Sequence, residues 1–262
     1  MLFGSKYVAK VGTTRRFYNR IFGFPLYIGD RVRAHHVVRL LNPNPEDTIL
    51  DAGCGIGVYS IEYGLKGAQV IGVDISRERI HQAYMALKAV GMSDQAFLVI
   101  ADICNLPIKR GVFNKISCVD VLEHIKKDFE SVAEFRRVLK SWGALVAHVP
   151  QASSACSLLS MSNQISYSKN LGHVRMGYTV KELRKLLNGA GFSVTRLEET
   201  FKKFAGLAFE INHILKHSLL GSVLFPILYT FSMLDFLSKG KGKGLLITAL
   251  PSPLERSTDS CH

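Results

Sequence analysis

The sequence of 262 residues contains no Cys-x-x-Cys pair, and its cysteines are odd in number. Such a set excludes a disulfide framework and a cysteine-ligated zinc site, and it indicates a reducing compartment. Cys54 and Cys118 fall in segments predicted to be core, where a thiol acts as a small apolar side chain. The full set is Cys54, Cys104, Cys118, Cys156 and Cys261.

A secretory signal is also lacking, because no apolar run follows Met1 and Lys6 and Lys10 interrupt the early stretch. We therefore expect a cytoplasmic protein, with an organellar transit peptide as the alternative suggested by the basic bias of residues 1–40. Acidic residues are few overall, and the formal net charge is +12. This charge favours anionic partners, either nucleic acid, phosphorylated substrates or a membrane surface, and does not choose among them.

The most informative stretch that is present covers residues 48–60. A short buried strand is expected to end at Asp51, and a helix is expected to begin at Val58. A strand, a glycine turn and a helix N-terminus together let the backbone approach a nucleotide-like ligand. The turn between them contains Gly53, Cys54, Gly55 and Gly57.

The glycine spacing argues against a dinucleotide. A Gly-x-Gly-x-x-Gly fingerprint starting at Gly53 would need its third glycine at position 58, which is Val58, whereas the third glycine is Gly57. The carboxylate of Asp51 would also repel a pyrophosphate. It suits a ligand with a cationic end, such as the amino group of a methionine moiety.

Acidic residues follow the next two predicted strands as well. Asp74 ends the strand predicted over 69–73 and follows Asp51 by 23 residues, the distance at which a carboxylate can accept the hydroxyls of a ribose. Asp102 and Ile103 follow a third strand, over 96–101. The cofactor site of a nicotinamide-dependent dehydrogenase does not require an acidic residue at the end of this third strand.

Strands alternate with helices along most of the chain, which predicts a doubly wound, mostly parallel α/β sheet. Helices are expected over residues 13–41 before the first strand. A helix carrying Phe129 and Leu139 follows the fourth strand, and residues 140–143 are predicted to turn into the fifth. A capping box at Thr179 and Glu182 starts a later helix. The remaining strands are predicted at 114–119, 144–148, 192–197 and 244–250.

The sequence resembles the class I S-adenosylmethionine-dependent methyltransferases in four elements that follow one another in the same order. They are the glycine turn, the acidic strand ends, the Val121-Leu122-Glu123-His124-Ile125 element and the strand opened by Gly191-Phe192. The ubiquinone and menaquinone pathway type is especially similar. The resemblance covers roughly residues 15–200 and 244–250. It implies a Rossmann-like sheet of seven strands with an antiparallel last strand.

The resemblance also implies roles for single residues. The methionine portion of S-adenosylmethionine would lie on Asp51 and the glycine turn (Gly53, Cys54, Gly55, Gly57). The ribose would meet Asp74 beside Ile75, the adenine would meet Asp102 and Ile103, and Val119 would pack near the cofactor.

Base candidates lie after the fourth and fifth strands and in residues 172–178. Glu123, His124 and His173 are the tentative catalytic set, and His148 and Tyr178 are further candidates. Asp120-x-x-Glu123-His124 with a later His173 is similar to the divalent-metal arrangement of ubiquinone-pathway O-methyltransferases and small-RNA 2′-O-methyltransferases. Because Asp120 stands where that pattern has Glu, a bound metal is the less favoured expectation.

Residues 219–234 carry no charge and include Pro226, which is expected to interrupt a helix. Sixteen helical residues span roughly 24 Å, short of the ~30 Å bilayer core. A lid, a dimer interface and contact with a membrane surface through 205–238 remain open. The expected units are a cap (1–45), a core (46–200 and 244–250), this insert (201–243) and a tail (251–262).

We therefore expect methyl transfer to oxygen or carbon of a small, apolar or lipid-like acceptor. An RNA methyltransferase and a non-catalytic, membrane-docked cofactor scaffold are the alternatives. Nucleic acid is disfavoured, because no Asn/Asp-Pro-Pro-Tyr/Phe element and no added RNA-binding module are present.

Overall fold

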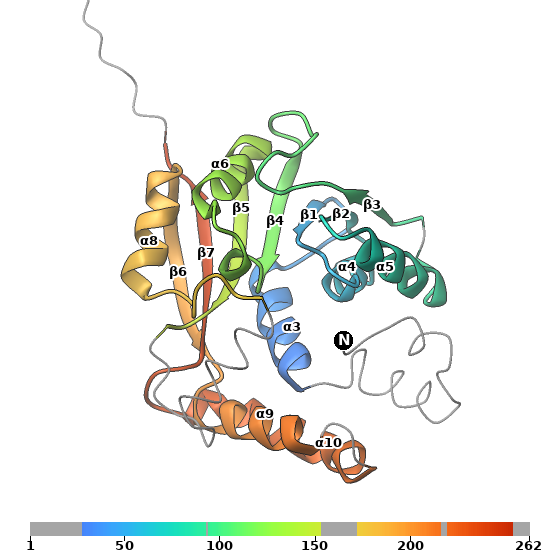
Figure 1. Cartoon of the computed structure of the whole chain (residues 1–262), viewed down its shortest axis with the longest axis vertical. Helices are drawn as coiled ribbons and strands as arrows, with labels where there is room; N and C mark the ends of the chain where they lie inside the picture. The colour runs from blue at the N-terminus through green and yellow to red at the C-terminus, as the bar shows by residue number, and fades with distance from the viewer. Residues whose placement is uncertain (1–27, 93, 153–171, 216–218, 254–262) are drawn as a thin grey trace, which may run out of the picture.

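A computed structural model describes residues 28–92, 94–152, 172–215 and 219–253. The part of the predicted helical segment 13–41 that precedes residue 28 lies outside these ranges. Seven strands form one sheet in the order β3-β2-β1-β4-β5-β7-β6 (Figure 1). Their bounds are β1 Thr48–Ala52, β2 Gln69–Asp74, β3 Ala96–Ile100, β4 Phe113–Val119, β5 Leu139–Pro150, β6 Phe192–Thr200 and β7 Gly244–Pro251.

The first five strands pair in parallel, and β7 pairs antiparallel to both β5 and β6. The predicted doubly wound sheet with an antiparallel last strand is thereby confirmed. The strand order reverses between β1 and β4, and the carboxyl ends of the strands on either side of this switch point form the usual ligand crevice of such sheets.

Helices cover both faces of the sheet (Figure 1). Hydrophobic side chains from α3, α4 and α5 pack on one face, and those from α6 and α8 pack on the other. Successive side chains of a strand point to opposite faces and so contribute to both cores. Ile49 and Val146 pack on the face covered by α3, α4 and α5, whereas Leu50 and Leu145 pack on the face covered by α6 and α8. The bounds of these helices are α3 Ile28–Leu41, α4 Val58–Gly64, α5 Arg77–Ala89, α6 Asp128–Val138 and α8 Val180–Gly189.

The insert between β6 and β7 is helical, as predicted. It comprises α9 (Lys203–Leu215), α10 (Leu219–Ser232) and the 3-10 turn η2 (Met233–Leu237). These elements lie at one end of the molecule, away from α6 and α8 (Figure 1). Their buried side chains form a third cluster with Ile28 and Val32 of α3. The insert is therefore anchored to the domain through the start of α3.

Three details differ from the sequence expectation. The α6 helix ends at Val138, and Leu139 with the predicted turn belongs to β5, where the register shifts between the pairs Phe113–Leu139 and Lys115–Ala144. Phe129 is half-exposed rather than buried. Pro226 lies inside a continuous α10.

The lost backbone hydrogen bond at an internal proline costs about 3 kcal/mol. Burial of Phe225 and Leu228 on either side of Pro226 offsets this cost. The capping box is confirmed, because Thr179 Oγ1 accepts from the Glu182 N–H at 3.2 Å and Glu182 Oε2 accepts from the Thr179 N–H at 2.8 Å. Such caps stabilise a helix by about 1 kcal/mol.

Candidate cofactor and catalytic site

The glycine turn is held against β2 by two backbone hydrogen bonds. The N–H groups of Gly53 and Cys54 both donate to the Val73 carbonyl, at 2.8 and 2.9 Å. A Cβ on Gly53 would lie only 2.4 Å from a side-chain methyl of Val121, so position 53 excludes larger residues by space as well as by conformation. All three turn glycines have positive φ: Gly53 (74°), Gly55 (53°) and Gly57 (82°).

Asp74 links this turn to the end of β2. Its Oδ2 accepts from the Gly55 N–H at 2.9 Å, and its Oδ1 accepts from the Ser76 N–H at 2.8 Å. The carboxylate is thus fixed in orientation beside the turn, and each oxygen keeps a further lone pair for a ligand hydroxyl. Ile75, between Asp74 and Ser76 in the chain, exposes its side chain to solvent.

Asp51 is buried and points toward α4, where its Oδ2 accepts from Ser60 Oγ at 2.6 Å. Burial raises the pKa of its carboxyl to about 7, although the Ser60 hydrogen bond opposes this shift. A cationic group brought beside Asp51 would favour the ionised form. The binding of a ligand amino group at this strand end stays a prediction.

The remaining predicted cofactor residues also lie at the carboxyl edge of the sheet. Cys54 is buried, and burial raises the pKa of its thiol, so it acts as packing beneath the turn rather than as a nucleophile. Asp102 is exposed and accepts from the Cys104 N–H at 2.9 Å. Ile103 and Val119 are buried, in the two opposite sheet cores.

A charged network lies directly after β4. Asp120, at a left-handed φ of 52°, accepts from Arg33 at 2.8 Å and is 2.5 Å from His148 Nδ1. Although burial alone would raise it, Arg33 and His148 hold the pKa of Asp120 below its ordinary value. The other His148 nitrogen is 2.9 Å from Thr200 Oγ1. Because both nitrogens of His148 are engaged, this histidine positions Asp120 and is not an available base.

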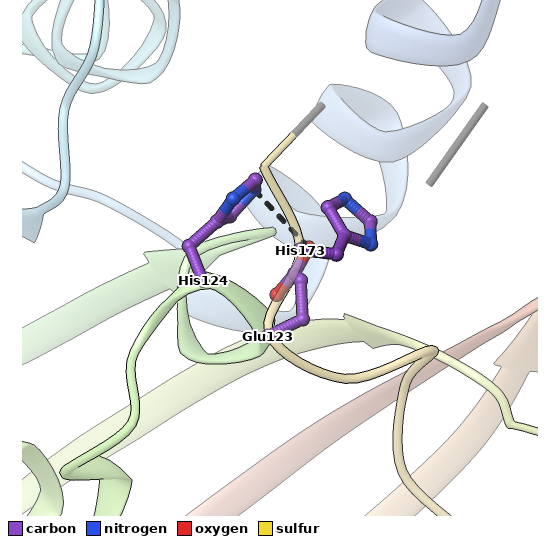
Figure 2. A group of neighbouring side chains, drawn as sticks. All are labelled: Glu123, His124 and His173. Atoms are coloured by element: carbon purple, nitrogen blue, oxygen red, sulfur yellow. Dashed lines mark ion pairs between the residues drawn. The ribbon is translucent and has the colours of Figure 1, made fainter. Parts of the chain in front are cut away.

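The three tentative catalytic residues do converge (Figure 2). Glu123 and His124 project from η1 (Leu122–His124), and His173, in the segment before α8, lies beside them (Figure 2). The two imidazoles form an edge-to-face pair with centroids 4.5 Å apart. The backbone ties the segments together, since the Val174 N–H donates to the Glu123 carbonyl at 2.9 Å.

Glu123 is the most unusual member, being only 1% exposed with no hydrogen-bond partner for either carboxylate oxygen within the described part of the chain. Burial and the neighbouring Asp120 raise its pKa well above the ordinary value. Burial lowers the pKa of both His124 and His173. These shifts favour the protonated form of Glu123 and the neutral form of His124, whose Nε2 lies 4.0 Å from Glu123 Oε1 (Figure 2).

Two further residues that the sequence offered as site candidates have structural roles instead. The Tyr178 hydroxyl is buried and donates to Asp128 Oδ2 at 2.8 Å, so this residue braces the segment that carries His173. Asp120 joins Arg33 and His148, not the group formed by Glu123, His124 and His173. Arg33 was not found from the sequence, because nothing local marks a helical arginine whose partner lies 87 positions away.

Comparison with known proteins agrees with this geometry. Residues 50–147 match a family model described as a methyltransferase domain. This stretch is a methyltransferase domain of the class I S-adenosylmethionine-dependent type. The resemblance seen in the sequence is confirmed, and so is the fold that it implied.

The curated relatives of this chain are distant. The magnesium-protoporphyrin O-methyltransferase of Synechocystis is 27% identical over 60% of this chain and 67% of its own length. The ubiquinone biosynthesis O-methyltransferase of Nitrosomonas europaea is 24% identical over 45% of this chain and 50% of its own.

Among solved structures, phosphoethanolamine N-methyltransferase 2 of Haemonchus contortus aligns with a TM-score of 0.66 and 18% identity, over 94% of this chain and 59% of that one. That likeness shows the fold. Aligned regions cover 49%, 67% and 39% of the length of three curated relatives, so the chain spans about half the length of the curated relatives it matches.

Proposed function

We propose that the protein transfers the methyl group of S-adenosylmethionine to oxygen or carbon of a small, apolar acceptor. The observation that carries the cofactor part is the clamp of Asp74 on the Gly55 and Ser76 N–H groups, next to the buried Asp51 at the switch point of the sheet. The clamp fixes the Asp74 carboxylate where it could accept ribose hydroxyls, and the Asp51 carboxylate on the adjacent strand could bind an amino group.

S-adenosylmethionine would supply an activated methyl group on its sulfonium. Asp51 with the glycine turn would hold the methionine portion, and Asp74 the ribose. Asp102 would accept from the adenine amino group while Ile103 offers its N–H, with Val119 packing beneath. These roles align the reacting atoms, which is the main contribution a protein makes to such a displacement.

An oxygen acceptor must lose its proton as the new O–CH3 bond forms. The lowered pKa values leave His124 and His173 neutral at physiological pH, so each has a nitrogen lone pair that could take this proton. The Nδ1 of His124 lies 3.3 Å from the Gly172 carbonyl. If Nδ1 donates there, Nε2 is the atom that receives the proton.

A divalent cation at Glu123, His124 and His173 is the less favoured alternative. The donor chemistry fits, since an unpartnered buried carboxylate and two neutral imidazoles are ordinary metal ligands. However, their ligand atoms are mutually within 4.8 Å, whereas bonds of ~2.1 Å place ligands about 3.4 Å apart. The side chains would have to close around an ion.

The acceptor class is supported by the apolar insert, which covers the start of α3, and by relatives. The similar proteins from Synechocystis and Nitrosomonas are named for magnesium-protoporphyrin and ubiquinone biosynthesis. An apolar acceptor would pair with the hydrophobic insert as a polar one would not.

The test is a transfer assay with methyl-labelled S-adenosylmethionine and a whole-cell extract divided into lipid, small polar and RNA fractions. We expect label to appear in the organic-soluble fraction and to be lost in the His173→Ala variant. Label confined to RNA would overturn the acceptor class. Absence of label in every fraction, with S-adenosylhomocysteine still bound, would overturn catalysis in favour of a binding scaffold.

A further inference from the structure

The solvent-facing side of α10 and η2 is apolar apart from Thr230. In α10 the exposed positions are spaced by three and four residues, which places them on one side of the helix. Thr230 belongs to this side, but its hydroxyl donates to the Pro226 carbonyl at 2.9 Å, so it satisfies its hydrogen bond within the helix. We call this the outer face, and its members are Leu220, Val223, Ile227, Thr230, Leu234, Phe236 and Leu237.

These side chains are not needed to hold the insert on the domain. The inward positions of α10, Phe225 and Leu228, already pack on Ile28 and Val32 of α3. Ile227 nevertheless leaves 65% of its surface exposed, and Phe236 leaves 78%. A helix that is apolar on every side is a sign of a second apolar environment beyond the protein core.

Among the insert residues that the structure describes, the exposed charges are all of one sign. Residues 201–243 contain only two acidic residues, Glu210 and Asp235, and both are buried. Glu210 pairs with Lys243, and Asp235 accepts from the Lys202 N–H at 2.8 Å at the start of α9.

The exposed charge of the described part of the insert is therefore positive. It is carried by Lys203, Lys239 and Lys241. These cations lie in the same insert as the exposed apolar residues, with no exposed carboxylate to oppose them.

We infer that the outer face rests on an anionic lipid surface, with α10 lying in the plane of the interface. Exposed apolar side chains with cationic neighbours and no exposed carboxylate are complementary to the acyl chains and anionic headgroups of such a surface. No helix in the described ranges is long and apolar enough to cross a bilayer. A second copy of the chain is disfavoured as occupant, because it would bring the same lysines toward one another.

Vesicle flotation of the full chain tests this inference without any need for turnover, so it can fail while the proposed methyl transfer stands. We expect flotation with vesicles of phosphatidylcholine mixed with phosphatidylserine and much weaker flotation with phosphatidylcholine alone. Removing the charge of Lys239 and Lys241 as a double Gln variant should weaken binding about 25-fold, since each lysine near an anionic surface contributes about fivefold.

Matched controls are available at the opposite side of the domain. Leu65 is 65% exposed, the same fraction as Ile227, so Leu65→Glu should float like the wild type whereas Ile227→Glu should lose more than tenfold in binding. Lys66 and Lys88 serve as the matched lysine pair. Equal loss in both members of a pair would overturn the inference. So would a wild-type dimer that Ile227→Glu dissociates without any binding to vesicles.

Discussion

Asp51 gives the protein a predicted pH dependence of its affinity for an S-adenosyl ligand. Its carboxyl has a pKa of about 7 in the free protein because it is buried against α4. A ligand amino group would bind only the ionised form, so protons compete with the ligand. By the ordinary titration relation, the ionised fraction falls from about three-quarters at roughly pH 7.5 to about one-tenth at roughly pH 6.

Since the ligand amino group is itself about 60% protonated at roughly pH 7.5 and almost fully protonated at roughly pH 6, affinity for S-adenosylhomocysteine should fall about fivefold over this interval, which is ~1 kcal/mol. The titration stops at roughly pH 7.5 because an ordinary α-amino group, with a pKa of about 7.7, is still mostly protonated there. Calorimetry in two buffers of different ionisation enthalpy should also detect the net release of about one third of a proton per ligand near pH 7, because Asp51 loses about half a proton and the ligand amino group gains about a sixth.

Two variants sharpen this test. Asp51→Asn should bind more weakly and show no dependence on pH over the same range. Ser60→Ala removes the hydrogen bond that lowers the pKa of Asp51, so the midpoint should move to higher pH. A flat affinity profile in the wild type, or an unchanged slope in Asp51→Asn, would refute the reasoning.

Three further predictions concern stability and catalysis. The pKa of Asp51 is higher in the folded than in the unfolded protein, so ionising its carboxyl destabilises the folded state increasingly as pH rises from about 4 to about 7. Asp51→Asn should therefore stabilise the ligand-free protein at roughly pH 8 by up to ~4 kcal/mol, measured by thermal unfolding. Gly53→Ala should lower the free energy of unfolding by several kcal/mol, since its Cβ would clash with a methyl group of Val121. The Cβ of Gly55→Ala meets no atom within 4 Å, so this variant should lose only about 1 kcal/mol. Denaturant titrations measure both. His173→Ala should lower the transfer rate about 10²-fold or more without changing S-adenosylhomocysteine affinity, and EDTA should leave the wild-type rate unchanged; a rate abolished by EDTA and restored by Mn²⁺ would show a metal at this site instead.

The cofactor edge could be predicted from the sequence because its signals are local. A glycine turn, a strand that ends in an acid and a capping box each depend on neighbouring residues, and the structure places Gly53, Asp74 and Thr179 as expected. The apolar insert was also visible, because sixteen residues without charge leave a clear compositional mark.

What the sequence could not supply depends on contacts between distant segments. The Arg33–Asp120–His148–Thr200 network brings together one helix and the ends of three strands, and no spacing rule links their positions. The continuity of α10 through Pro226 was missed for a similar reason, since burial of its inward face outweighs the local penalty.

The central claim is that Asp74, fixed on the glycine turn, holds the ribose of an S-adenosyl ligand. Calorimetric titration of the wild type with S-adenosylhomocysteine and with NADH tests it most directly, alongside Asp74→Ala and the exposed control Glu46→Ala at the opposite end of β1. We expect heat with S-adenosylhomocysteine but not with NADH, a loss of at least tenfold in affinity for Asp74→Ala, and none for Glu46→Ala. Unchanged affinity in Asp74→Ala, or binding of NADH in place of S-adenosylhomocysteine, would contradict the account.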